Sequence, residues 1–317
     1  MNLFLDGYYA TSTHSGRDFQ RSFLTQASQN NQPSLNLASY GLDYDDDLFR
    51  GRIVGQFGDS VDRNYSGEKH AEWRFIQESY LGFHLSPSTT VDIGTFLSHI
   101  GAESWLSKDN LTYTRSLIAE FSPYYQTGAR LTHSISDSLQ GQLLILNGWQ
   151  NTTDSRHPAL GTQLVYSFGN EKVTSNVFIG EENYSERYFH NLILSTTRFT
   201  DLEISASFDI GHQTSVGSWA GGAVIAAHQM TQHTRLNGRI ETYQDQDAAI
   251  TSDSLGRGLR ASSISCGVDT KIAEHITLRT EIRSFWSPNR SFTIGTRQES
   301  NDVLVMTNLS FDYEQLL

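Results

Sequence analysis

Apolar and polar residues alternate one by one along most of this chain. In the segment 202–210, which reads LEISASFDI, the even-numbered positions are apolar and the odd-numbered positions are polar or charged. Because successive side chains of a β-strand point to opposite faces, such a segment forms a strand with one apolar and one polar face. The pattern recurs in segments of roughly ten residues separated by polar connections, which is typical of a transmembrane β-barrel.

The composition supports the same fold. Charged residues make up 18% of the 317-residue chain, and the mean hydropathy of −0.42 is too polar for a bundle of transmembrane helices. No apolar run reaches the length of about 18 residues that a transmembrane helix needs. A barrel explains both observations, because only half of each strand is apolar. The 5 Pro residues form no Pro-rich linker, so a single domain spanning 1–317 is expected.

Charge and motifs exclude several classes of partner. The formal net charge is −12, from 23 basic and 35 acidic residues, so no nucleic acid is expected, since phosphate binding needs a basic face. Cys266 is the only cysteine, which excludes an intrachain disulfide and a cysteine-based zinc site. The sequence has no metal-ligand spacing and no Gly-rich phosphate loop, so neither a metal nor a cofactor is expected. The first residues enter a strand directly, and we expect that a signal peptide has been removed and Met1 added.

Sixteen segments have the alternating pattern, and bacterial single-chain barrels have an even number of strands. The segments are residues 2–9, 35–42, 48–58, 73–85, 90–97, 127–135, 139–147, 160–168, 173–181, 189–198, 202–212, 219–230, 234–243, 259–270, 276–285 and 303–313. The segment 259–270 alternates irregularly, which predicts a bulge near Ser262 and Ser263. We therefore predict an all-β fold, a closed antiparallel transmembrane barrel of 16 strands (range 14–18), with short turns on one rim and long extracellular loops on the other.

The longest connection, 98–126, contains an ambiguous segment. Residues 113–121 are apolar enough to form a strand, but counting them gives seventeen strands and moves a long connection to the short-turn rim. We therefore assign 98–126 to one third loop that folds into the lumen as a constriction or plug. Backbone outside a strand is tolerated there because it contacts water or protein rather than lipid. The alternative is a strand at the edge of the loop, above the membrane.

Short motifs between Thr90 and Trp149 carry a family resemblance. They are VDIGTF (91–96), IGAE (100–103), YTRS (113–116), SPYY (122–125), TGAR (127–130) and LNGW (146–149). In these motifs the chain resembles the OmpL-like family of β-barrel porins of the bacterial outer membrane. The resemblance implies a pore among outer-membrane lipids, an inward third loop and passive passage of small hydrophilic solutes. A homotrimer is expected by analogy with that architecture. One departure is the end of the chain, FDYEQLL, which lacks the terminal aromatic residue usual in such barrels.

If apolar positions face lipid, the alternate positions face the lumen. The side chains assigned to the pore wall in this way are Arg50, Arg52, Arg74, Glu78, Asp92, Arg130, Arg235, Arg239, Glu241, Arg279, Glu281 and Arg283. With Glu203 and Asp209 added, eight arginines stand against six acidic residues, so the wall is balanced or slightly basic and a weak preference for anions follows. The sequence leaves open the alternative that these charges pair across neighbouring strands and select no ion.

The third loop contributes charges of its own. These are Lys108, Asp109, Arg115 and Glu120. If the loop folds inward, Arg115 and Glu120 are the candidates for a constriction that faces the basic wall.

Two other functions are compatible with alternating strands. An outer-membrane enzyme built on a barrel, such as a protease or lipase, needs a base oriented toward a nucleophile, and only His99 near Glu103 and His212 near Asp209 could form such a pair. A soluble all-β binding protein would bury its apolar positions between two sheets. The predicted function is a non-enzymatic diffusion channel for small hydrophilic solutes, located in the bacterial outer membrane.

Overall fold

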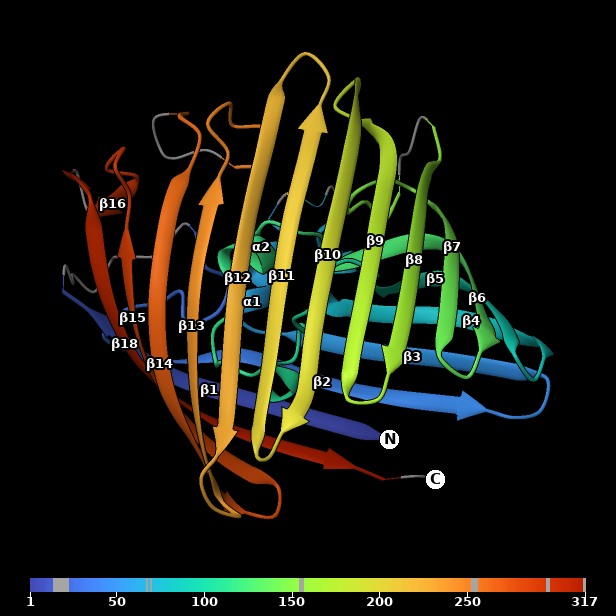
Figure 1. Cartoon of the computed structure of the whole chain (residues 1–317), viewed down its shortest axis with the longest axis horizontal. Helices are drawn as coiled ribbons and strands as arrows, with labels where there is room; N and C mark the ends of the chain where they lie inside the picture. The colour runs from blue at the N-terminus through green and yellow to red at the C-terminus, as the bar shows by residue number, and fades with distance from the viewer. Residues whose placement is uncertain are drawn as a thin grey trace.

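The structure is a computed structural model, and it describes residues 1–13, 23–66, 68, 70–153, 157–251, 256–294 and 297–315. Sixteen strands pair antiparallel in one closed barrel (Figure 1). They are β1 (Asn2–Ser12), β2 (Pro33–Asp45), β3 (Phe49–Phe57), β4 (Ile76–Ser86), β5 (Thr89–Leu97), β6 (Tyr125–Ser136), β7 (Leu139–Leu146), β8 (Ala159–Phe168), β9 (Glu171–Glu182), β10 (Ser185–Phe199), β11 (Leu202–Gln213), β12 (Gly217–Gln229), β13 (Thr234–Gln244), β14 (Arg260–Ala273), β15 (Ile276–Trp286) and β18 (Asn301–Glu314). The predicted fold class and strand number are confirmed.

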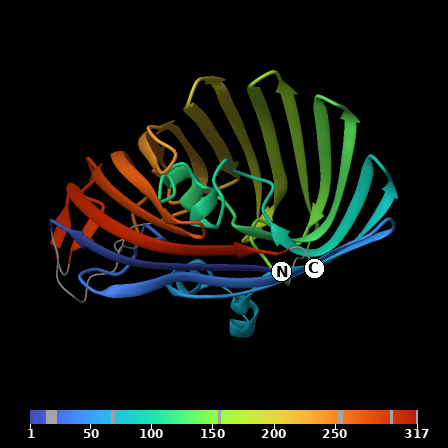
Figure 2. The ribbon, with the colours of Figure 1, turned by 90° about the horizontal axis from the view of Figure 1, so that it is seen from below.

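The barrel closes between its first and last strands. β1 pairs with β18 from Asn2↔Glu314 to Ser12↔Leu304, and with β2 on its other side. Closure removes the free sheet edge whose unpaired backbone groups could not be satisfied in lipid. Figures 1 and 2 show the short helix α2 (Leu117–Glu120), part of the third loop, inside the ring of strands.

Large apolar side chains point away from the barrel. Leu81 of β4 is 72% exposed, and along β11 the exposed Phe208 and Ile210 alternate with the buried Ser207 and Asp209. The apolar positions therefore form an outer surface that suits hydrocarbon, whereas a soluble sandwich would gather them in its interior. Among the described residues, no helix is long and apolar enough to cross a membrane.

The two rims differ in their connections. Those after β2, β4, β6, β8, β10, β12 and β14 are short turns, and both chain ends lie at this short-turn rim. The opposite, long-loop rim carries long connections except after β9 and β11. The β9–β10 connection is a two-residue turn in which Asn183 and Tyr184 have φ values of 51° and 65°, as a tight hairpin of type I′ requires. Long connections were expected after β9 and β11, over 182–188 and 213–218, and both predictions are wrong.

The interior near the long-loop rim is apolar rather than polar. Inward aromatic rings of the wall, such as Phe178 of β9 and Phe285 of β15, pack with Phe23 of the first loop and Leu117 of the third in one buried cluster. The last long loop adds Phe292 from its hairpin of β16 (Phe292–Ile294) and β17 (Arg297–Glu299). Part of the lumen is therefore filled by loops that share a hydrophobic core with the wall.

The irregular segment 259–270 has a different explanation from the one expected. β14 pairs with β13 without a shift from Arg260↔Gln244 to Thr270↔Thr234, so this stretch contains no bulge at Ser262 and Ser263. Ala261 faces inward and is 2% exposed. The predicted bulge is wrong because it assumed polar residues at every inward position, whereas this end of the strand faces the apolar interior.

Candidate functional site

The third loop crosses the inside of the barrel. It is slightly shorter than expected, 98–124, because β6 begins at Tyr125. The ring of His99 lies 2.7 Å from Gln126 Oε1 of β6 and 3.1 Å from Val177 O of β9. On other sides, Trp105 Nε1 donates to Gln56 of β3 at 2.9 Å, and Ser122 Oγ donates to Asp209 of β11 at 3.1 Å. The loop is thus held between well-separated parts of the wall.

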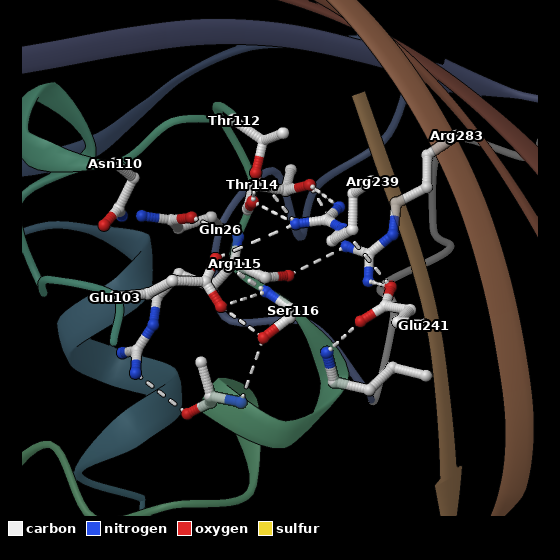
Figure 3. A network of polar contacts seen from close by, with 12 residues as sticks. Gln26, Glu103, Asn110, Thr112, Thr114, Arg115, Ser116, Arg239, Glu241 and Arg283 are labelled. Atoms are coloured by element: carbon white, nitrogen blue, oxygen red, sulfur yellow. Dashed lines mark hydrogen bonds and ion pairs between the residues drawn. The ribbon is translucent and has the colours of Figure 1, made fainter. Parts of the chain in front are cut away.

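Four charged side chains of β13 and β15 hold the middle of this loop, and we call them the latch: Arg239, Glu241, Glu281 and Arg283. Figure 3 shows Arg239, Glu241 and Arg283 beside the loop. The backbone N–H of Thr114 donates to Glu281 Oε2 at 2.8 Å, and that of Leu117 donates to Glu241 Oε2 at 2.6 Å. In return, Arg239 Nη1 donates to Thr114 O at 2.6 Å, and Arg283 Nη1 donates to Arg115 O at 3.0 Å. Buried backbone groups outside regular structure need such partners, and the charged wall supplies them.

The latch is also paired internally. Arg239 lies 3.0 Å from Glu281 and 3.4 Å from Glu241, and Arg283 pairs with Glu241. All four side chains were expected to line the pore, and they do face inward. The third loop covers them, however, leaving at most 1% of each side chain exposed. In this structure they bind the loop and do not reach the water of the lumen.

Glu103 completes the network from the loop side. Its carboxylate accepts hydrogen bonds from the backbone N–H of Ser116 at 3.0 Å and from the Ser116 hydroxyl, and it lies 3.9 Å from Arg239. Burial raises the pKa of Glu103, while Arg239 and the hydrogen bonds from Ser116 act in the opposite direction. Burial therefore favours the neutral form of this carboxyl group, while Arg239 and Ser116 favour the ionised form.

A second set of charges holds the loop nearer the short-turn rim. Asp269 of β14 accepts from Arg279 Nε at 3.0 Å and from Arg235 Nη2 at 2.7 Å. Both guanidinium groups also donate to the backbone O of Asn110, at 2.9 Å and 3.1 Å, and Arg279 donates to Ser107 O. The side chain of Arg279 is 2% exposed and that of Arg235 is 28% exposed, so only Arg235 reaches the open lumen.

Asp6 of β1 is a buried anchor that the sequence analysis missed. It accepts hydrogen bonds from Asn36 Nδ2 of β2 at 2.8 Å, from Ser107 Oγ of the third loop at 2.7 Å and from Asn308 of β18. Its position offered a signal, because alternation places this carboxylate inward between Phe4 and Tyr8. A charge flanked by inward aromatic residues requires buried partners.

Arg115 and Glu120 do not form the expected constriction toward the arginine wall. Arg115 is 4% exposed, donates to Ala119 O at 2.8 Å and stacks over the ring of Tyr124 at 3.9 Å. Glu120 accepts from Thr25 Oγ1 at 2.8 Å and from the Tyr124 hydroxyl at 2.7 Å. The prediction was wrong because α2 turns both side chains toward the loop itself and toward the first loop.

The first loop also enters the barrel, which the sequence analysis did not predict. Gln26 Oε1 accepts from the Arg115 backbone N–H at 3.0 Å, and the Phe23 ring packs 5.0 Å from the ring of Phe285. This segment has neither alternation nor a charge pattern, so its sequence contained no signal for an inward path.

Arginines on the β3–β6 wall stay partly open to the lumen. Arg50 and Arg130 lie 3.1 Å and 2.8 Å from Asp92, and Arg52 lies 2.7 Å from Glu78. Their side chains are 27%, 16% and 26% exposed, whereas Asp92 and Glu78 are 2% and 9% exposed. Arg235 of β13 is a further arginine that stays partly open to the lumen, with 28% of its side chain exposed.

Arg74 is not part of this wall. β4 begins at Ile76, and residues Ala71–Phe75 form the 3-10 helix η1 in the connection after β3. The guanidinium of Arg74 pairs at 3.2 Å with Asp62 of the helix α1 (Asp59–Asn64). Its assignment to the pore wall is wrong because the alternation was extended beyond the start of the strand.

Lys108 and Asp109 occupy the short 3-10 helix η2 (Ser107–Asp109), with an N–O distance of 3.9 Å between their charged groups. They line a cavity of about 400 Å³ at the short-turn rim, together with Arg235, Lys271 and Asp312. A second cavity at this end, of about 310 Å³, includes Lys172 and Glu203.

Neither of the two pairs that the alternative enzyme function would need forms. His99 binds Gln126 and Val177 instead of Glu103, and His212 Nδ1 lies 2.9 Å from Ser218 Oγ while Asp209 accepts from Asn191 at 2.6 Å. In the part of the chain that the structure describes, no three His, Cys, Asp or Glu side chains gather in a way that could hold a metal ion.

Comparisons with known proteins agree with this architecture. A family model described as "Putative beta-barrel porin-2, OmpL-like" matches residues 1–313. The structure is similar to OmpF of Salmonella typhi in complex with daunomycin, with 10% identity over 98% of this chain and 97% of that chain and a TM-score of 0.65. An anion-selective porin from Comamonas acidovorans has 11% identity over 99% of both chains and a TM-score of 0.61. OmpT of Vibrio cholerae in its trimer form has 9% identity over 99% of both chains and a TM-score of 0.61. A search of curated protein sequences found no match.

Proposed function

The chain belongs to the OmpL-like beta-barrel porin-2 family, and we propose on that premise that it is a passive diffusion channel for small hydrophilic solutes in the bacterial outer membrane. The observation that carries the proposal is a closed ring of sixteen strands with an apolar outer surface, over a chain that matches the family from residue 1 to 313. Open porin-type barrels of this size enclose an aqueous channel. The third loop narrows it, because the loop is bound to the wall on several sides.

A weak preference for anions is the finer part of this proposal. The charges of the wall form ion pairs across neighbouring strands, which was the alternative to ion selectivity. The two side chains of such a pair, however, differ in the fraction that is exposed. Arg50 and Arg130 are 27% and 16% exposed in front of Asp92, which is 2% exposed. At Asp92 a solute in the lumen therefore approaches guanidinium groups first, whereas Arg52, which is 26% exposed, also pairs with Asp43, which is 43% exposed. A narrow channel with low-dielectric walls amplifies such a local imbalance.

Reversal potentials in a salt gradient test both parts of the proposal. The purified protein in planar bilayers is expected to conduct with a chloride-to-potassium permeability ratio above one. The variant R50Q/R52Q/R130Q is expected to lose roughly half of that excess, because the field of the wall follows its exposed charges. The matched control is R198Q, which removes an arginine that is 73% exposed and lies 3.8 Å from Glu171.

The outcomes separate the two parts. Cation selectivity of the wild-type channel would refute the anion preference and leave the diffusion channel standing. A folded, inserted protein that carries no current would refute the channel itself. Turnover of peptides or phospholipids by the same preparation would favour the barrel-scaffold enzyme instead.

We further propose that the protein assembles as a homotrimer in the outer membrane. The support is the trimer form of the similar OmpT structure. The mass of the complex extracted in mild detergent and measured by native mass spectrometry is expected to be three times the 35.6 kDa of the chain. A mass of one chain under the same conditions would contradict the trimer.

A further inference from the structure

The cavity that Lys108 and Asp109 line at the short-turn rim lies directly against the third loop. It has a volume of about 400 Å³, and its lining includes Lys108 and Asp109 of η2 together with Arg235, Lys271 and Asp312 of the barrel. Arg235 and Arg279 both donate to the backbone O of Asn110, directly after η2, and Arg279 also donates to Ser107 O within η2. A solute that has passed the third loop, or is about to meet it, can therefore occupy this cavity.

The buried acid of this cavity is already neutralised. Asp269 accepts hydrogen bonds from Arg235 and Arg279, and also from Asn237 Nδ2 at 3.1 Å. Two guanidinium groups share this single carboxylate, so the three charges together carry one net positive charge. The carboxylate also fixes the orientation of both guanidinium groups, which reduces the entropy that a ligand would otherwise lose in ordering them.

Several donors remain open toward the cavity. Only Nε and Nη2 of Arg235 form hydrogen bonds with the described residues, which leaves Nη1 for a ligand. Within that same part of the chain, the ammonium group of Lys271 has no ion-pair partner, and Lys108 has only Asp109 at 3.9 Å. Asp109 is 50% exposed, and it and Asp312 are the acidic groups that weaken the site. Weak binding suits a site on a diffusion path, because a solute must also leave it.

We infer that this cavity is a binding site for small oxyanions, with carboxylate or phosphate groups held by Arg235 and Lys271 and approached by Lys108. Carboxylates and phosphates share this recognition, because both accept charge-assisted hydrogen bonds from a guanidinium nitrogen such as Arg235 Nη1 and from an ammonium group. As a solute site on a conduction path, the inference rests on the proposed channel function. Occupancy by an anion, however, is measurable without any current.

Two measurements test the site. The first is binding of inorganic phosphate to the folded protein in detergent, followed by the line width of the phosphate ³¹P resonance. The second is reduction of the single-channel chloride current by phosphate added at the short-turn side. The double variant R235Q/K271Q is expected to weaken phosphate binding at least tenfold and to abolish the block. K172Q is the matched control, because Lys172 lines the neighbouring cavity at the same end of the barrel, and it is expected to bind phosphate as the wild type does.

Repeating the binding measurement with succinate distinguishes carboxylates from phosphates as ligands. The anion that binds more strongly identifies the class of oxyanion that the site prefers. Equal phosphate binding by the wild type and R235Q/K271Q would overturn the inference, as would a conducting wild type that binds neither anion. Phosphate binding by a wild type that carries no current would refute the proposed channel and leave the oxyanion site standing. Since R235Q leaves Asp269 paired with Arg279 at 3.0 Å, the variant retains a partner for that buried carboxylate.

Discussion

Replacing residues 99–123 with Asn-Gly is expected to raise the single-channel conductance roughly fivefold or more, because it removes the loop that crosses the lumen of a sixteen-stranded barrel and leaves the first and last long loops in the interior. The design is compatible with the local geometry. Leu97 pairs with Tyr125, and the backbone N–H of Ser98 donates to Tyr124 O at 3.1 Å. β5 and β6 can therefore be joined as a hairpin by a two-residue turn, for which Asn-Gly is a favoured sequence.

The expected gain in conductance depends on the path of the third loop across the lumen and not on the length of the loop. The third loop contacts β3, β9, β11, β13 and β15 by hydrogen bonds, so it crosses the lumen instead of lying along one wall. Replacing residues 214–216 between β11 and β12 with the same dipeptide is the matched control, and its conductance is expected to equal that of the wild type. Wild-type conductance of a folded 99–123 variant, with its barrel verified by circular dichroism, would contradict the role assigned to the loop.

The second large effect is expected in the latch. Glu281→Ala removes the acceptor of the Thr114 N–H and the carboxylate that lies 3.0 Å from Arg239. Breaking a buried ion pair by removal of one partner costs about 3–5 kcal/mol. Undocking of the loop is therefore expected to become at least about 100-fold more frequent. Amide hydrogen exchange at Leu117 measures undocking directly, because its N–H donates to Glu241, which the substitution leaves in place, whereas the Thr114 N–H loses its acceptor in any case.

Two further variants test whether faster exchange comes from loss of the latch or from a general loss of stability. Glu171→Ala removes a carboxylate from an exposed pair at 3.8 Å, and such pairs contribute about 0–1 kcal/mol, so Leu117 exchange should not change. Arg239→Met combined with Glu281→Leu leaves no unpaired charge between these two positions and is expected to recover part of the protection. An unchanged exchange rate of Leu117 in Glu281→Ala would show that the latch does not hold the loop.

Most of the wall could be predicted from the sequence, because its constraints are local. Side chains alternate with a period of two, and hydrocarbon outside the barrel requires apolar residues at every second position. This requirement holds for Phe208 and Ile210 without reference to any distant residue. The prediction failed where a strand faces another part of the chain instead of water, as at Ala261, and where the strand had already ended, as at Arg74.

The candidate site was less predictable, since its residues are defined by contacts between distant segments. Asp6 contacts Ser107, 101 positions later, and Glu281 contacts Thr114, 167 positions earlier. Alternation indicated that Asp6 and Glu281 point inward, but it contains no information about what lies opposite. The inward path of the first loop and the orientation of Arg115 likewise depend on packing that no short pattern describes.

The tripeptide Gly-Arg-Ile occurs at 51–53 and again at 238–240, and it shows where the two kinds of information separate. In both copies the isoleucine faces outward, with Ile53 56% and Ile240 58% exposed, and the arginine faces inward. That much is determined by the sequence, through strand periodicity and the apolar solvent around the barrel. Arg52 is 26% exposed to the lumen while Arg239 is fully buried. Only the tertiary structure decides this difference, because the third loop packs on β13 and needs buried partners for its backbone there.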